Sequence, residues 1–195
     1  MRISEVNPNT SKGSYGKGLN LARLWSLHAL SKIQNKFDTI YVIGSWYGNI
    51  SIMFALLKNY FKFNKIVNVE QDKKALQASE ETITKLGIKN IEPMYADANE
   101  LDYRQLGNNG LVVCFSCMNI RGTDWFYNIP DGTLVMLQAR TNDLKAVTQF
   151  KNFNDFANTY RMSEILHTDK LNLSDPETDY AAWLLIGIKW EQMNL

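Results

Sequence analysis

The chain of 195 residues has only two cysteines and four prolines. The cysteines, Cys114 and Cys117, lie in one apolar segment, and two such residues form neither a disulfide framework nor a four-ligand zinc site. No apolar run approaches the roughly 20 residues of a membrane helix, and the N-terminus lacks the apolar core of a secretory signal. We therefore expect a cytoplasmic protein with buried thiols, no membrane partner and no metal.

An excess of charge of either sign is also missing. Lys and Arg number 21 against 20 Asp and Glu, which gives a net charge of +1. This balance provides no bulk field for a polyanion or an anionic membrane, so that only a local basic patch would attract one. Because 45% of the residues are hydrophobic, global disorder is excluded, and the length predicts a single domain with a sizeable core.

Apolar strands and amphipathic helices alternate along most of the chain. The patterns predict strands at 39–43, 66–69, 88–95, 111–115 and 133–137, and helices at 19–34, 48–60, 72–86 and 152–160, with short helical pieces near 100–106 and 124–127. The strands are apolar on both faces, which is typical of a parallel sheet covered by helices on each side. Asp72 is expected to cap its helix and Gly87 to end it.

The C-terminal part departs from this alternation. Two segments that favour strands, 163–173 and 180–190, are joined by a short turn-rich connection that leaves no room for a crossover helix. They should pair antiparallel. A mostly parallel sheet with such a hairpin differs from the ordinary dinucleotide-binding fold, and the chain also lacks a G-x-G-x-x-G loop, so a nicotinamide-dependent dehydrogenase is disfavoured.

The first strand runs directly into Gly44-Ser45-Trp46-Tyr47-Gly48. Together with the alternation and the hairpin, this segment resembles class I S-adenosylmethionine-dependent methyltransferases, over about residues 19–190. The resemblance implies a three-layer, Rossmann-like α/β fold with a seven-stranded, mostly parallel sheet, and S-adenosyl-L-methionine as the cofactor. Trp46 stands where that family has its middle glycine. Glycines suit a loop that turns sharply and lets the backbone approach a ligand.

Acidic residues follow the next two strands of the predicted sheet. Glu70 comes 22 residues after Gly48, and the resemblance makes it the ligand of the ribose hydroxyls, with Gln71 beside it; the alternative is a carboxylate that caps a strand end. The resemblance implies that Asp97, with Ala98 beside it, accepts a hydrogen bond from the adenine amino group. The alternative is that Asp97 opens an Asx turn. Because ligands of open α/β sheets bind outside the carboxyl ends of the strands, these residues should share one crevice.

The segment after the fourth strand carries no recognisable catalytic motif. The Asn/Asp-Pro-Pro-Tyr sequence of enzymes that methylate planar amino groups is absent, so the methyl acceptor does not follow from the sequence. Methyl transfer depends mainly on placement of the acceptor. Ser116, Asn119 and Asp124 are the polar candidates for this role, and loop hydrogen bonding is the alternative for Ser116 and Asn119.

Three glycines within residues 13–18 precede the first helix. They do not form a phosphate-binding loop, because no strand comes before them and the Ser or Thr that would hold magnesium is missing. We expect residues 1–18 to form an N-terminal arm or lid, whose Tyr15 and Lys17 would cover the cofactor. Residues 19–195 would then form the single domain.

Two functions follow from these patterns. The first is a methyltransferase that acts on an unidentified acceptor, with a small molecule or protein favoured and RNA left open. The second is a noncatalytic S-adenosylmethionine-binding or protein-interaction subunit with the same fold, which the Trp46 loop and the missing catalytic motif favour. Methyl turnover would discriminate between them. The oligomeric state stays open.

Overall fold

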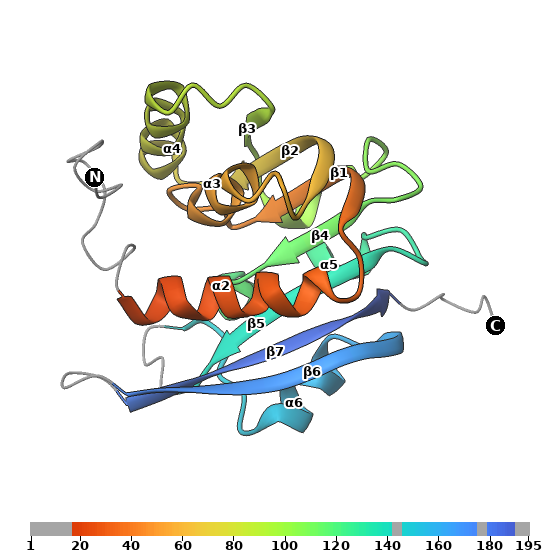
Figure 1. Ribbon diagram of the computed structural model, residues 1–195. Helices are drawn as coiled ribbons and strands as arrows, with labels where there is room; N and C mark the ends of the chain where they lie inside the picture. The colour runs from red at the N-terminus through yellow and green to blue at the C-terminus, as the bar shows by residue number, and fades with distance from the viewer. Residues whose placement is uncertain (1–16, 142–145, 175–178, 190–195) are drawn as a thin grey trace.

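A computed structural model describes residues 17–141, 146–174 and 179–189, which form a seven-stranded sheet with helices on both faces (Figure 1). The strands are β1 (Lys36–Ile43), β2 (Lys62–Glu70), β3 (Ile91–Tyr95), β4 (Leu111–Cys114), β5 (Leu134–Arg140), β6 (Met162–Ser174) and β7 (Asp179–Lys189). The helices are α2 (Lys17–Ser31), α3 (Asn49–Leu56), α4 (Lys73–Lys85), α5 (Asp124–Tyr127) and α6 (Phe153–Thr159), with single 3-10 turns η2 (Ala98–Glu100) and η3 (Cys117–Asn119).

The strands lie in the order β3-β2-β1-β4-β5-β7-β6. The five strands β3, β2, β1, β4 and β5 pair in parallel, whereas β7 pairs antiparallel with both β5 and β6. This arrangement confirms the predicted fold class, including the C-terminal hairpin. It brings the carboxyl ends of the first four strands to one edge of the sheet.

Alternate residues of the strands serve two separate cores. Ile40 and Val42 pack in the core that α2 and α3 cover, whereas Tyr41 and Ile43 pack in the core that holds α5 and α6. Each such side chain is fully or almost fully buried. Burial of an aliphatic side chain contributes about 1.5–3 kcal/mol to the free energy of folding. The apolar character of both faces of β1 is therefore what commits it to the middle of the sheet.

The predicted elements are mostly confirmed, but several predicted boundaries are wrong: β2 begins at Lys62 and not at 66, β3 begins at Ile91 and not at 88, and α2 ends at Ser31 and not at 34. The Asp72 carboxylate caps α4 by accepting hydrogen bonds from the backbone N–H of Lys74 at 2.8 Å and of Ala75 at 3.2 Å. The helix predicted over 48–60 ends at Leu56, and no helix covers 101–106. There the Asp102 carboxylate accepts from the backbone N–H of Arg104 at 2.9 Å, a local bond that competes with helix formation.

Within the described ranges, no helix combines the length and the apolar character of a membrane span, and no group of three or more His, Cys, Asp or Glu is placed to hold a metal. Cys114 and Cys117 are free and fully buried, as predicted. Of the predicted arm, residues 1–16 lie outside the described part of the chain, and α2 already begins at Lys17.

Candidate functional site

The loop after β1 makes a tight turn with three residues in the left-handed region. Gly44 has φ +61°, Trp46 +52° and Gly48 +72°. The backbone N–H of Ser45 donates to the carbonyl of Val69 at 3.0 Å, which attaches the loop to the end of β2. Trp46 is the non-glycine residue among the three, and a left-handed conformation costs such a residue about 1–2 kcal/mol. The surrounding structure therefore has to hold Trp46 in place.

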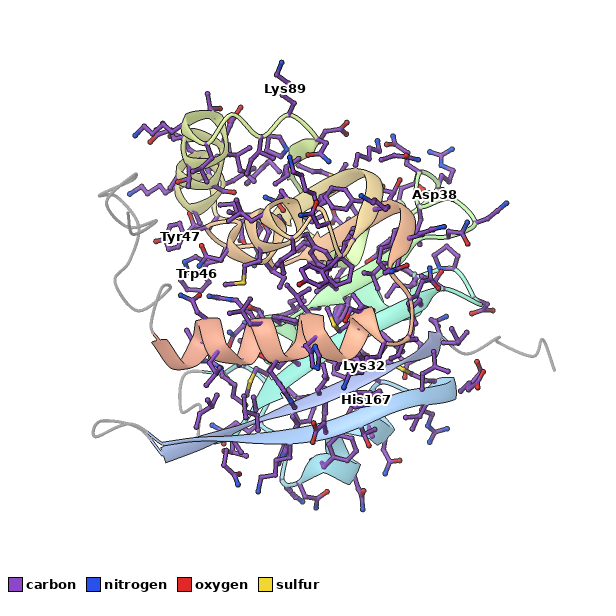
Figure 2. All side chains as sticks on the ribbon, in the orientation of Figure 1. Lys32, Asp38, Trp46, Tyr47, Lys89 and His167 are labelled. Atoms are coloured by element: carbon purple, nitrogen blue, oxygen red, sulfur yellow. The ribbon has the colours of Figure 1, made fainter. Side chains whose placement is uncertain are left out.

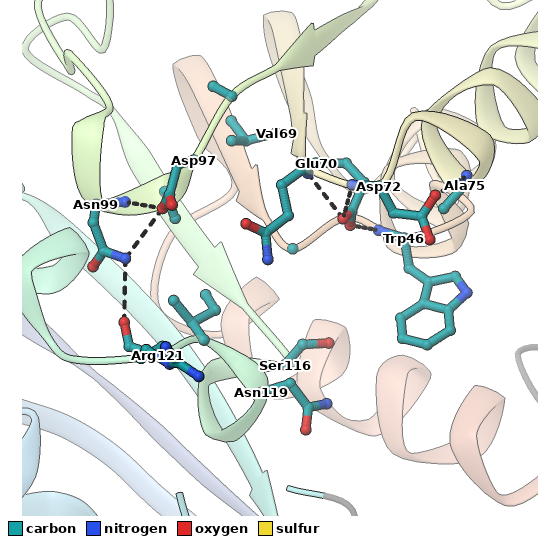
Figure 3. A pocket seen from close by; sticks show the side chains of 15 residues that line it. Trp46, Val69, Glu70, Asp72, Ala75, Asp97, Asn99, Ser116, Asn119 and Arg121 are labelled. Carbon is teal, nitrogen blue, oxygen red and sulfur yellow. Dashed lines mark hydrogen bonds between the residues drawn. The ribbon is translucent and has the colours of Figure 1, made fainter. Parts of the chain in front are cut away.

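The Glu70 carboxylate stabilises this conformation of Trp46. Its Oε2 accepts a hydrogen bond from the Trp46 backbone N–H at 2.7 Å, and its Oε1 accepts from the N–H of Gln71 at 2.9 Å and of Asp72 at 3.0 Å (Figure 3). Glu70 is only 8% exposed, and hydrogen bonds to an ionised group are stronger than neutral ones. Because each carboxylate oxygen has two acceptor sites, Oε2 keeps capacity for one further donor, such as a hydroxyl.

The two glycines of the loop are needed for different reasons. A Cβ on Gly48 would overlap Oγ of Ser79 and would lie 3.0 Å from Nδ2 of Asn68, so this glycine allows the loop to pack against α4 and β2. A Cβ on Gly44 would meet Ser116 Cβ at 3.5 Å, which is an ordinary contact. At Gly44 only the positive φ favours glycine.

The end of β3 is connected to the start of α5 through Asn99. Asp97 Oδ1 accepts from the Asn99 backbone N–H at 2.9 Å and from its Nδ2 at 3.1 Å. The same Nδ2 donates to the carbonyl of Arg121 at 3.2 Å, and Asn99 Oδ1 accepts from the backbone N–H of Trp125 at 3.1 Å. Among the described residues, none donates to the other Asp97 oxygen, Oδ2. Asp97 is thus oriented with one acceptor available.

These elements surround a cleft of about 260 Å³ at the carboxyl edge of the sheet. In Figure 3, Asp97 and Asn99 stand at one end of the cleft, Trp46 at the other, and Glu70 between them, with Ser116 and Asn119 on the side of β4. The lining residues are Gly44, Trp46, Val69, Glu70, Gln71, Asp72, Ala75, Ala96, Asp97, Ala98, Asn99, Ser116, Asn119, Ile120 and Arg121.

The cleft brings together most of the residues that the sequence singled out. Gly44, Trp46, Glu70, Gln71, Asp97, Ala98, Ser116 and Asn119 all line it. Four others stand outside the lining: Ser45, Tyr47 and Gly48 in the loop, and Asp124, which is exposed at the start of α5. Tyr15 and the side chain of Lys17 lie outside the described part of the structure, so their predicted contact with the cofactor stays a prediction.

Sequence reasoning missed Asn99, Arg121 and the apolar Val69, Ala75 and Ile120. Asn99 follows Asp97 by two residues, a spacing that signals a local Asx turn but not the bond to Trp125, which is 26 positions away. Arg121 is exposed in the loop after η3 and carries no motif. Only the tertiary structure brings these residues to the cleft.

The charges of the cleft favour a cationic ligand. Three carboxylates, those of Glu70, Asp72 and Asp97, line it, against the single guanidinium of Arg121. Like-signed carboxylates around a concave surface raise the local concentration of cations.

The thiols of Cys114, the last residue of β4, and Cys117, in η3, take no part in this charge distribution. Burial raises the pKa of the Cys117 thiol to about 12, and burial also raises the pKa of Cys114. The Cys117 sulfur lies 3.2 Å from the carbonyl of Gln138, to which it donates. Both thiols are therefore protonated at neutral pH, and neither is an activated nucleophile.

No protein-family model and no curated protein matches this sequence. Solved structures do share the fold. The N-methyltransferase NodS of Bradyrhizobium japonicum, solved with S-adenosyl-L-homocysteine, aligns over 95% of this chain and 94% of its own, with a TM-score of 0.70 and 9% identity. Magnesium protoporphyrin IX methyltransferase of Synechocystis, solved with bound S-adenosylmethionine, aligns over 86% and 77%, with a TM-score of 0.58 and 12% identity.

A third similar structure is precorrin-6y C5,15-methyltransferase of Geobacter metallireducens, which aligns over 97% of this chain and 96% of its own with a TM-score of 0.57 and 15% identity. Two of these names state an acceptor, magnesium protoporphyrin IX and precorrin-6y, whereas the name of NodS states only N-methylation. At such identities the likeness establishes the three-layer α/β fold of class I methyltransferases for this chain.

Proposed function

We propose that the protein is an S-adenosyl-L-methionine-dependent methyltransferase that acts on a still unidentified acceptor. The observation that carries the proposal is the order of the site: the tight turn at Gly44, the carboxylate of Glu70 and the carboxylate of Asp97 follow three adjacent parallel strands and line one cleft. Ligands of open α/β sheets bind at this edge. Proteins of the same fold that were solved with the cofactor or its demethylated product support the assignment.

The residues of the cleft fit this cofactor in chemistry as well as in position. Glu70 Oε2 has acceptor capacity for a ribose hydroxyl, and Asp97 Oδ2 for the adenine amino group. Val69, Ala98 and Ile120 add apolar surface for the adenine ring. The excess of carboxylates suits a ligand that carries a sulfonium and an ammonium group against one carboxylate.

When bound, the cofactor would supply an electron-poor methyl carbon on a positively charged sulfur, open to in-line attack by an electron pair of the acceptor. The protein then has mainly to place the acceptor. We assign that role to Ser116 and Asn119, which line the cleft at the end of β4. Both side chains are uncharged, so the acceptor atom needs to be nucleophilic by itself or lose its proton to solvent. Asp124, exposed on α5, would contribute only to an acceptor that extends beyond the cleft.

Calorimetric titration with S-adenosylmethionine and S-adenosylhomocysteine tests the proposal. We expect micromolar binding, about −8 kcal/mol, and a loss of about tenfold in Asp97→Ala, because its accepted hydrogen bond disappears. Glu80→Ala, which removes an exposed carboxylate of α4, is the matched control and should bind as the wild type does. Transfer of a labelled methyl group to a panel of small molecules, proteins and RNA in cytoplasmic extract then separates an enzyme from a noncatalytic binding subunit.

A further inference from the structure

A second hollow lies at the opposite edge of the sheet, where β1 and β2 begin. It measures about 620 Å³ and is lined by Lys36 at the start of β1, Lys62 at the start of β2 and Lys58 between α3 and β2. Figure 2 shows Asp38, which also lines it, on the other side of the molecule from Trp46 of the cleft. The eight residues of β1 separate the two sites by about 26 Å.

Positive charge is concentrated around this hollow. The segment 56–66 contains three lysines and no acidic residue. Of these, Lys65 is paired with Glu92. Lys36, Lys58 and Lys62, which line the hollow, form no ion pair with another described residue. The Lys62 ammonium donates to the carbonyl of Lys58 at 3.0 Å, which leaves both positive charges in place.

One carboxylate opposes these lysines. Asp38 is partly buried, and its Oδ2 accepts from the backbone N–H of Asn109 at 3.1 Å. The net charge of +1 for the whole chain therefore conceals a local excess of positive charge at this edge of the sheet.

The other lining residues are asparagines and aromatic rings. Four asparagines line the hollow, and their amides can both donate to phosphate oxygens and pair with base edges. Phe63, near the start of β2, is a partly buried lining residue. Tyr60 lies beside the lining, in the turn before β2, and is 66% exposed. Lysines beside an exposed aromatic ring are the combination with which proteins hold single-stranded nucleic acid.

We propose that this hollow is a binding surface for single-stranded nucleic acid. Lys36, Lys58 and Lys62 contact phosphates, and Tyr60 stacks on a base. An acidic peptide would satisfy the lysines, but it would leave the amides without base edges and the tyrosine without a planar partner. The proposal does not depend on methyl transfer, because the surface is remote from the cleft.

The test is the binding of a labelled oligouridylate of about 12 nucleotides, followed by fluorescence anisotropy between about 50 and 200 mM salt. With three phosphates neutralised, log K should fall against log salt concentration with a slope of about −2. In the double variant Lys36→Glu, Lys58→Glu we expect at least about tenfold weaker binding and a slope closer to zero than about −1.

Two further variants keep the result interpretable. Lys151→Glu with Lys170→Glu, at exposed positions outside the hollow, is the matched control and should bind RNA as the wild type does. Tyr60→Ala should weaken binding about fivefold or more, with an unchanged salt slope, because stacking releases no counterions. Circular dichroism and the thermal midpoint establish that each variant is folded.

Three results would overturn the proposal: no binding by the wild type at 50 mM salt, an equal loss in the control, or tighter binding of poly-L-glutamate than of the oligonucleotide. The last result would assign the surface to an acidic protein instead. Failure of the wild type to bind S-adenosylhomocysteine would bear on the cleft alone.

Discussion

Replacement of Asn99 by alanine should weaken both the fold and the cleft. The side chain makes three hydrogen bonds: it donates to Asp97 Oδ1 at 3.1 Å and to the Arg121 carbonyl at 3.2 Å, and it accepts from the backbone N–H of Trp125 at 3.1 Å. Each of these hydrogen bonds contributes roughly 0.5–1.5 kcal/mol to the free energy of unfolding, and less where water can replace the partner. The backbone N–H of Trp125, whose ring is buried, would also lose its acceptor. We expect the free energy of unfolding to fall by about 2 kcal/mol, measured by urea denaturation.

The same change should alter which nucleobase the cleft prefers, because Asn99 orients Asp97. Wild-type protein should bind S-adenosylhomocysteine more tightly than S-inosylhomocysteine. In the latter a carbonyl replaces the amino group that would donate a hydrogen bond to Asp97. In Asn99→Ala this preference should shrink about fivefold, measured by calorimetry with both ligands. A purely structural role would lower both affinities equally.

Asn128→Ala is the matched control for this prediction. It removes only the bond from Asn128 Nδ2 to the Asn99 carbonyl, at 2.9 Å, and leaves the contact between Asn99 and Asp97 intact. It should therefore keep the preference for adenine. An undiminished preference in Asn99→Ala, or a loss of stability below about 0.5 kcal/mol, would refute the role assigned to Asn99.

Three further predictions concern the frame of the site. Gly48→Ala should lower the free energy of unfolding by about 2–4 kcal/mol, from positive φ and the contact with Ser79 Oγ, and Ser79→Ala in the same chain should recover part of it in urea titrations. Glu70→Gln should cost about 1–2 kcal/mol by the same measurement, because its three charge-assisted bonds are weakened, whereas Glu80→Gln should have no effect. Because burial raises the pKa of Cys117 to about 12, only the unfolded chain ionises at this thiol above pH ~8.5. This thiol should leave stability unchanged below that pH and lower it by about 1.4 kcal/mol per pH unit above it. Cys117→Ala should remove this part of the slope and leave the part due to Cys114, whose pKa burial also raises.

The parts of the fold that depend on local pattern were predictable from the sequence. β1 and β4 are short, apolar on both faces and buried, so their place in the middle of a parallel sheet follows from the need to cover both faces. The antiparallel hairpin followed from a connection too short for a helix, and the cap of α4 followed from Asp72. The resemblance placed Glu70 and Asp97 in the cleft, where both are found.

The parts that depend on contacts between distant residues were not predictable. The left-handed φ of Trp46 is held by Glu70, 24 positions away, and nothing in the local sequence shows that bond. Gly48 fits a ligand-binding motif, yet the residue it makes room for is Ser79. The hollow lined by Lys36, Lys58 and Lys62 could not be predicted for a different reason. Its positive charge is cancelled in the net charge of the whole chain, and only the pairing of β1 with β2 brings Lys36 beside Lys62.

Calorimetric titration of the folded wild type with S-adenosylhomocysteine, beside Asp97→Ala and its control Glu80→Ala, tests the assignment of the cleft most directly. We expect a one-to-one complex of micromolar affinity that Asp97→Ala weakens about tenfold and Glu80→Ala leaves unchanged. No heat of binding with the folded wild type, or an affinity that is the same in all three proteins, would contradict the assignment.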